Sequence, residues 1–333
     1  MVAEALPATD RPRLVRSRIS GGDRAFRVLA YGGGAAVVLV MLLVGLFLLV
    51  RGWSAVRVAG WSFLSTEAWD PDSGNFGIAA VLVGTALIAT VALVFSVPLA
   101  TGTALYISEY APGGVKRALI ALVDLMAAVP SVVYGLWGAY LLERNIVPLA
   151  RWLSTWFGWI PVFRVDGADP TNPLATASVY TSSTFIAGMV VSMMVTPIIC
   201  SVMREVFSQA PVGEREGALA LGATRWGMIR AVVLPFGRGG MIGGTMLGLG
   251  RALGETIAVY MIISPVFEIK WQVLQNGGNS ISALIAQRFG ESTEFALSAL
   301  MAAGLVLFVL TLIVNMVASA IITRSRSGAA SDA

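Results

Sequence analysis

Two side chains of opposite charge, Arg251 and Glu255, interrupt one of the apolar segments of this chain. The segment covers residues 239–266, so a continuous helix would place Arg251 about 18 Å along it, near the middle of a hydrocarbon layer about 30 Å thick. A charge at that depth is costly unless it is paired or faces water. Glu255 follows at i+4 and would share the helix face of Arg251. The spacing predicts either an ion pair that fixes helix packing or a cation on an anion pathway, held by Glu255.

Arginine suits phosphate-like oxyanions because its planar fork donates two parallel hydrogen bonds. A second group of polar residues lies in the apolar segment 118–142. Asp124 is an ionisable residue within that segment, and Pro130 removes an intrahelical hydrogen bond just before Ser131. Asp124 and Ser131 therefore join Arg251 and Glu255 as candidate pathway residues. The alternatives are a local polar partner for Asp124 and simple packing for Ser131.

The composition excludes several classes of protein. Of 333 residues, 56% are hydrophobic and 13% are charged, whereas a soluble domain carries about 25% charge. Histidine is absent and Cys200 is the single cysteine, which argues against a metal site, a disulfide within the chain and Ser-His or Cys-His catalysis. The net charge of +4 predicts no nucleic-acid binding, because the basic residues flank apolar segments. The chain is expected to be an all-α transmembrane protein and not an enzyme.

Six apolar segments are long enough to cross a membrane as helices. They cover about residues 28–50, 78–107, 118–142, 184–203, 239–266 and 295–322. Together they predict one transmembrane domain, 28–322, between an N-terminal tail, 1–27, and a C-terminal tail, 323–333. The first segment is longer than the apolar region of a secretory signal, so it is expected to be retained.

The distribution of basic residues predicts the orientation of these spans. With the N-terminus inside, fifteen Lys and Arg residues fall on the inner side and seven on the outer side. Both termini and the loop 204–238 are therefore expected in the cytoplasm. The aromatic-rich segment 146–163 is short and is expected to lie in the outer membrane interface, in contact with lipid. The alternative, a seventh crossing, would undo the charge bias.

The loop 204–238 is polar and helix-prone, and its length suggests a surface on which another protein docks. Glu216, Ala218, Gly222, Leu234 and Pro235 are spaced as in the cytoplasmic signature loop of ABC-importer permeases, and this resemblance implies that they form the docking surface. Gly222 would end a short helix with a sharp turn. An ordinary amphipathic interfacial loop is the plainer alternative. The two lysines, Lys116 and Lys270, have no P-loop context, so an ATP-driven process would need its ATPase in another subunit.

Glycines recur four residues apart at Gly240, Gly244 and Gly248, directly after this loop. This spacing lets another helix approach closely. The approaching helix could belong to the same chain or to another subunit, and the spacing does not distinguish the two.

Three stretches together resemble the PstC-type permeases of the bacterial phosphate (Pst) ABC importers. They are Val-Pro-Ser-Val-Val-Tyr-Gly-Leu-Trp at 129–137, the loop pattern Glu-Gly-Ala…Gly…Val-x-Leu-Pro at 216–235, and Gly-Leu-Gly-Arg-Ala-Leu-Gly-Glu-Thr-Ile-Ala-Val at 248–259. The loop pattern is shared by many importers, whereas the stretch around Arg251 is more specific. Gly217 and Val232 depart mildly from the usual loop residues.

The resemblance implies the fold and the partners. It implies a six-span type I ABC importer permease in the bacterial inner membrane, with the loop 204–238 as its coupling loop. A PstA-like permease would complete the pore, and an ATPase dimer would bind ATP-Mg, so no cofactor is expected in this chain. An extracytoplasmic phosphate-binding protein would deliver inorganic phosphate, and Arg251 and Glu255 would lie on its route.

Two other functions are compatible with parts of the sequence. A permease for another oxyanion, such as sulfate or molybdate, would use the same arginine chemistry. A stand-alone ion-coupled carrier would need no ATPase, and the docking surface of the loop argues against it.

Overall fold

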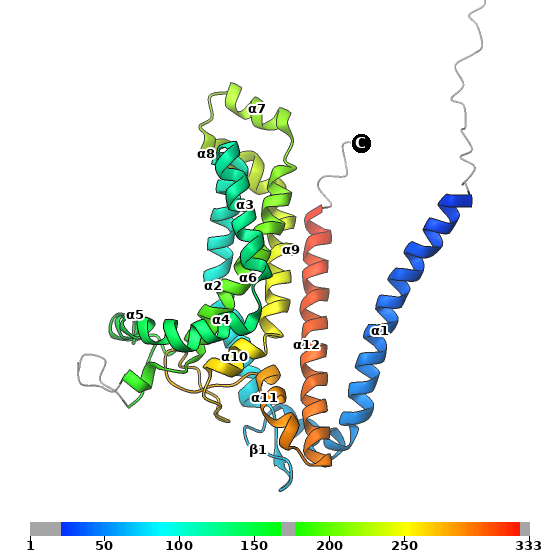
Figure 1. The fold of residues 1–333 in the computed structure, drawn as a ribbon, viewed down its shortest axis with the longest axis vertical. Coiled ribbons are helices and arrows are strands. Elements are labelled where there is room, and N and C mark those ends of the chain that lie inside the picture. The colour runs from blue at the N-terminus through cyan, green and yellow to red at the C-terminus, as the bar shows by residue number, and fades with distance from the viewer. Residues whose placement is uncertain (1–20, 168–176, 327–333) are drawn as a thin grey trace, which may run out of the picture. The chain divides into compact units, whose positions relative to one another are not determined.

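The computed structural model describes residues 21–167 and 177–326 (Figure 1). Residues 1–20 and 327–333, which hold most of the two expected tails, lie outside the described residues. The chain divides into two units between Phe47 and Leu48, and the second unit holds the packed core.

The described residues are mainly α-helical, as the composition predicts. The long helices are α1 (Gly21–Ala59), α2 (Ala79–Leu105), α6 (Thr184–Ser208), α9 (Leu234–Leu253) and α12 (Glu294–Arg326). The shorter helices are α3 (Gly113–Ala128), α4 (Ser131–Trp137), α5 (Glu143–Phe157), α7 (Val212–Ala220), α8 (Arg225–Met228), α10 (Ile257–Ile262) and α11 (Ile281–Arg288). Segments of π-helix cover Tyr106–Tyr110, Gly138–Leu142 and Ile229–Val233, and 3-10 turns cover Gly60–Leu64, Ala177–Tyr180 and Phe289–Glu291. A short hairpin pairs β1 (Trp69–Asp70) with β2 (Asn75–Phe76), with Trp69 opposite Phe76.

Helix α6 is the centre of the packed core, with α2 and α9 against it. Its apolar side chains are buried on several faces, and Ile186, Ile199, Met203 and Phe207 have no exposed surface. The side chain of Ser183 starts this helix by accepting a hydrogen bond from the backbone N–H of Ile186. A helix that is apolar all round is suited to the middle of a bundle.

Within residues 21–167 and 177–326, five helical stretches have the length and hydropathy to cross a membrane, and a bent pair of helices makes a sixth if it is one span. The bent pair differs from the single span expected over 118–142: α3 ends at Ala128, and α4 with α5 continues at 90° to it. Pro130 explains the break, because it has no N–H and holds Val129 and itself in extended conformations. The segment 239–266 is also interrupted, since α9 ends at Leu253 and α10 begins at Ile257.

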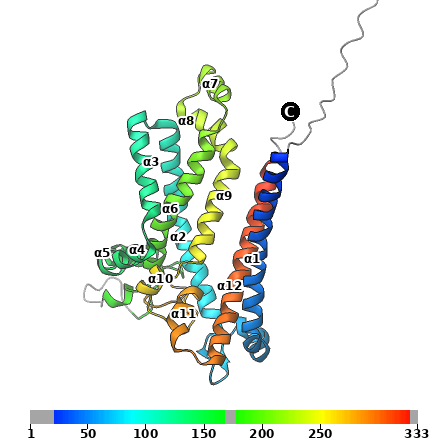
Figure 2. The ribbon, with the colours of Figure 1, turned by 45° about the vertical axis from the view of Figure 1, so that its right-hand side comes forward.

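Helix α5 occupies the first part of the aromatic segment 146–163. It runs across the direction of α2, α3 and α6 in both views (Figures 1 and 2). Ile146, Ala150 and Ser154 form its buried side, while Trp152 and Trp156 are exposed. This placement favours an interfacial helix over a seventh crossing.

The C-terminal part of α1, from Leu48 onward, packs against α12. Gly52 lies so close to Ala302 that a Cβ at residue 52 would be 2.8 Å from the Ala302 backbone nitrogen. Ser54 Oγ and Ser298 Oγ are 2.6 Å apart, and Ser298 Oγ also lies 2.7 Å from the Arg51 carbonyl oxygen. Small and hydroxyl-bearing residues are typical of close helix contacts in membranes.

Candidate functional site

Arg251 lies in the last turn of α9, a mainly apolar helix, and its side chain is exposed. Among the side chains described for residues 21–167 and 177–322, the guanidinium has no hydrogen-bond or ion-pair partner. An unpaired charge in an apolar membrane-spanning segment faces a water-filled space or another molecule. The arginine is therefore available to an anion.

Glu255 is buried and belongs to a different local structure. Its Oε1 accepts a hydrogen bond from the backbone N–H of Ala258, 3.3 Å away, at the start of α10. Its carbonyl oxygen accepts a hydrogen bond of 2.7 Å from the hydroxyl of Ser282 in α11. Ser280 Oγ is 3.3 Å from Ser282 Oγ and caps α11 through the N–H of Ala283. Glu255 thus joins α10 to α11.

The predicted pairing of Arg251 with Glu255 is wrong for this structure. The prediction assumed a helix that continues from residue 251 to residue 255, but α9 ends at Leu253. Gly254 follows as the C-cap, and Glu255 and Thr256 precede α10, so the i+4 relation does not put the two charges on one face. Arg251 is left without the carboxylate that was expected to neutralise it.

The bend between α3 and α4 is closed by a side-chain hydrogen bond. Pro130 cannot donate to the carbonyl oxygen of Met126, four residues earlier, which a helix would require. The hydroxyl of Tyr134 donates to that oxygen at 3.0 Å instead. Asp124 is exposed on α3, and Ser131 is half-buried in the first turn of α4. No hydrogen bond or ion pair joins any two of Asp124, Ser131, Arg251 and Glu255 in the described part of the chain.

Replacing Tyr134 with phenylalanine should lower the stability of the purified protein by about 0.5–1.5 kcal/mol, because the Met126 carbonyl loses the shorter of its two hydrogen bonds and keeps only that from the N–H of Val129, at 3.4 Å. Thermal unfolding in detergent measures the change. Tyr260→Phe is the matched control, since its ring is about half exposed. An equal shift in both variants would show that the hydroxyl of Tyr134 does not hold the bend.

The docking residues lie on α7 and on the chain that leads back to α9. Helix α7 stands at the end of the bundle formed by α2, α3, α6 and α9 (Figures 1 and 2). None of its residues is buried; Leu219 in α7 is 43% exposed, and Leu221, which follows the last residue of the helix, is 92% exposed. Large exposed apolar side chains that lie close together favour a contact with another protein.

The other marked docking residues have distinct places in this loop. Gly222 ends α7 with a φ of 86°, and its N–H bonds to the Leu219 carbonyl at 3.0 Å. Glu216 is exposed, Ala218 is partly buried, and Leu234 and Pro235 begin α9. The side chain of Thr224 caps α8 by accepting from the N–H of Gly227 at 3.1 Å.

The three glycines of α9 pack against α6 of the same chain. Gly240 meets the side chain of Val206, Gly244 lies near Val202, and a Cβ on Gly248 would be 2.5 Å from Ile199 Cδ1. Two of them, Gly244 and Gly248, are buried. The close approach left open by the sequence is therefore within the chain.

Gly248→Ala should destabilise the purified protein by about 1–3 kcal/mol, because the new methyl group overpacks against the fully buried Ile199. Gly250→Ala, in the same helix, is the control. Its Cβ would have Asn315 Oδ1 at 3.9 Å as a neighbour, so it should stabilise slightly through helix propensity. Equal effects of the two substitutions on thermal unfolding would contradict the packing argument.

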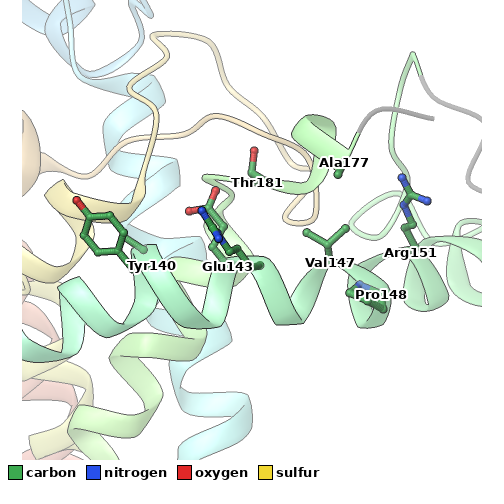
Figure 3. Close-up of a pocket in the computed structure, with 9 residues that line it drawn as sticks. Tyr140, Glu143, Val147, Pro148, Arg151, Ala177 and Thr181 are labelled. Carbon is green, nitrogen blue, oxygen red and sulfur yellow. The ribbon is translucent and has the colours of Figure 1, made fainter. Parts of the chain in front are cut away.

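A pocket of about 760 Å³ lies along α5 (Figure 3). Tyr140, Glu143 and Arg151 rise from the helix toward the loop that carries Ala177 and Thr181 (Figure 3). Glu143 Oε1 accepts a hydrogen bond of 2.9 Å from the N–H of Ser182, so this carboxylate fixes the turn that leads into α6. Arg144 also lines the pocket. The exposed Arg144 and the carboxylate of Glu143, which is engaged by the backbone, are the charged groups at the Tyr140 end of this pocket.

One contact that the sequence did not predict joins α7 to the corner between α2 and α3. Arg215 Nη2 is 3.3 Å from Glu109 Oε1. These residues are 106 positions apart, and neither position is distinctive by itself. The one available signal was Glu109 at the end of an apolar segment.

Comparisons with known proteins give the family of the chain. Residues 96–327 match the family described as binding-protein-dependent transport system inner membrane component. The phosphate transport system permease protein PstC 2 of Mycobacterium tuberculosis is 40% identical, over 90% of this chain and 91% of that protein. The phosphate transport system permease protein PstC of Mesorhizobium japonicum is 34% identical, over 98% and 99% of the two chains.

A solved structure gives the fold independently. A bacterial ABC transporter involved in the import of the acidic polysaccharide alginate superimposes with a TM-score of 0.52 at 18% identity, over 90% of this chain and 99% of that chain. At this identity the likeness concerns the fold, and it confirms the predicted fold of a type I ABC importer permease. The chain therefore belongs to the PstC-type permeases within the family of binding-protein-dependent transport system inner membrane components.

Proposed function

We propose that this chain is a pore subunit of an ATP-driven importer that moves inorganic phosphate into the cell by alternating access. The observation that carries the proposal is the exposed guanidinium of Arg251, which lies in an apolar helix with no partner in the described part of the chain. Its planar fork matches two oxygens of a phosphate. The names of the relatives, phosphate transport system permeases, support the same substrate.

The pathway would be completed by a second, PstA-like permease subunit. Arg251 has no neutralising charge in its own chain, so a passing anion or a facing subunit would have to balance it. Asp124 and Ser131 flank the bend between α3 and α4, where a proline-broken helix leaves backbone groups for a water-lined path. Glu255 supports this pathway from the side by fixing the start of α10, which follows Arg251 after a short turn.

The energy would come from a dimer of ATPase subunits that binds ATP-Mg on the cytoplasmic side. Leu219 in α7 and Leu221 directly after it are exposed apolar side chains that a groove on such a subunit would bury. Glu216 and Gly222 lie on the same helix and at its end. The excess of basic residues on this side supports its cytoplasmic orientation.

The opposite side would receive phosphate from an extracytoplasmic binding protein. The pocket along α5 is lined by the exposed Arg144, whose charge favours the approach of anions and acidic surfaces. The exposed Trp152 and Trp156 of the same helix suit the lipid interface, where tryptophan is enriched.

Uptake of labelled phosphate tests the proposal in cells that lack their own high-affinity system. The chain is expressed alone and then together with its candidate partner permease, ATPase and binding protein. We expect uptake with the complete set and none with the chain alone. Sulfate and molybdate in excess should leave the uptake unchanged.

Two outcomes would overturn the proposal in different ways. Uptake by the purified chain in liposomes without an ATPase would identify a stand-alone carrier. Strong competition by sulfate or molybdate would favour a permease for another oxyanion, and failure of the complete set to take up phosphate would overturn phosphate as the substrate.

A further inference from the structure

An ion pair joins α7, the helix of the docking loop, to the connection between α2 and α3. Arg215 in α7 and Glu109 in the π-helical segment Tyr106–Tyr110 approach to 3.3 Å. The side chain of Glu109 is 5% exposed and that of Arg215 is 19% exposed. The two atoms meet as charges without the alignment of a hydrogen bond, since Glu109 Oε1 has no hydrogen-bond donor among the described residues. Little water screens this pair, so its attraction is stronger than that of a surface pair.

Two further contacts strengthen the same junction. Arg215 Nη2 also donates to the carbonyl oxygen of Phe207, near the end of α6. The guanidinium of Arg225, in α8, lies over the ring of Tyr110 at 5.9 Å from its centroid. Arg215 and Arg225 therefore hold the two halves of the docking loop to adjacent residues, Glu109 and Tyr110, of the corner between α2 and α3.

Helix α3 connects this corner to the bend at Pro130, where the candidate pathway residues Asp124 and Ser131 lie. Residues 111 and 112 follow Tyr110, and α3 then runs from Gly113 to Ala128 without a buried residue. At its far end, the hydroxyl of Tyr134 fastens α4 to the carbonyl of Met126. Helix α3 is thus tied at both ends, and between them its partly buried Leu119, Ile120 and Val123 pack against the core, so a displacement of its first turn can move it as one body by sliding along that contact.

We propose that the ion pair of Arg215 and Glu109 is the link by which movement of α7 reaches α3 and the bend at Pro130. The proposal rests on the proposed function, in which an ATPase moves α7. Both residues are positioning residues, because they act on the pathway through α3 and touch no substrate. A coupling of this kind needs a continuous chain of rigid elements, and α7, the corner, α3 and α4 provide it.

The test uses the complete importer in liposomes and measures phosphate uptake and ATP hydrolysis side by side. Glu109→Gln and Arg215→Gln should keep ATP hydrolysis but lower the phosphate transported per ATP by about tenfold. The charge swap, Glu109→Arg with Arg215→Glu, should recover much of that loss. Asp23→Asn removes an exposed carboxylate from the first turn of α1, outside the docking loop, and should change neither quantity.

A second measurement needs no phosphate, so it separates this proposal from the substrate assignment. In a Cys200→Ser background, Ala127→Cys places a thiol on the exposed surface near the end of α3. Trapping the ATPase with ATP and vanadate should change the rate at which a water-soluble reagent labels this thiol, and Glu109→Gln should abolish the change. Normal transport per ATP in both single variants would overturn the link. So would an unaltered labelling response in Glu109→Gln, no response in the parent protein, or a charge swap as defective as the single variants.

Discussion

Arg251→Ala should abolish phosphate uptake by the complete importer while the protein still inserts and assembles. The guanidinium is exposed at the end of α9 and makes no hydrogen bond or ion pair with the described side chains, so its removal leaves no carboxylate unpaired. Two hydrogen bonds from a charged donor to the anion are worth enough to lower uptake by about two orders of magnitude. Uptake of labelled phosphate, with the amount of protein in the membrane measured by immunoblotting, tests this.

Two variants sharpen the interpretation. Arg251→Lys keeps the charge but loses the planar fork, so it should retain part of the uptake. Arg288→Ala removes an exposed arginine from the last turn of α11 and should have no effect. Undiminished uptake by Arg251→Ala would remove this residue from the pathway, whereas loss of the protein from the membrane would make it a packing residue.

Gly222→Leu should separate ATP hydrolysis from transport. Gly222 has a φ of 86° in the turn that ends α7, and a leucine there is strained by about 1–2 kcal/mol. No atom lies within 4 Å of its missing Cβ, so the effect comes from the backbone of the turn and not from a clash. The displaced end of α7 would carry Leu221 away from the ATPase, and uptake per ATP should fall by about tenfold.

The measurement compares ATP hydrolysis with phosphate uptake in the reconstituted importer. Gly222→Asn is the matched control, because asparagine tolerates a positive φ better than leucine, and it should keep most of the coupling. Tightly coupled uptake in Gly222→Leu would count against the assignment of α7 as the ATPase contact.

The sequence predicted the long helices well because length and hydropathy decide them. The segments 78–107, 184–203 and 295–322 correspond to α2, α6 and α12, whose apolar residues leave no alternative to a helix in a membrane. Hydropathy also predicts that α7 is exposed, because its polar residues lie between two apolar segments and do not enter the membrane. These features depend on each segment alone.

The breaks in the helices were harder to predict. Pro130 was recognised as a loss of one hydrogen bond, but membrane helices often continue through proline when neighbours compensate, as α2 does at Pro98 and α6 at Pro197. Here the hydroxyl of Tyr134 stabilises the bent form instead. The end of α9 at Leu253 has no proline to mark it, and the predicted pairing of Arg251 with Glu255 was wrong for that reason.

Contacts between residues far apart in the chain could not be predicted from the sequence. Glu109 and Arg215 meet because α2 and α6 pack side by side and end together, and hydropathy does not specify that arrangement. The same holds for the close approach of Gly248 to Ile199, which the spacing of the glycines suggested without naming the partner helix.

The exposed Leu221 at the end of α7 also affects how long an unassembled copy of this protein survives in the cell. Leu221 is 92% exposed, and a copy that has not met its ATPase would present this leucine to the cytosol. Quality-control proteases and chaperones recognise such exposed apolar side chains in unassembled subunits. The abundance of the ATPase would then set the lifetime of this chain, so the cell would keep the two in proportion without matching their rates of synthesis.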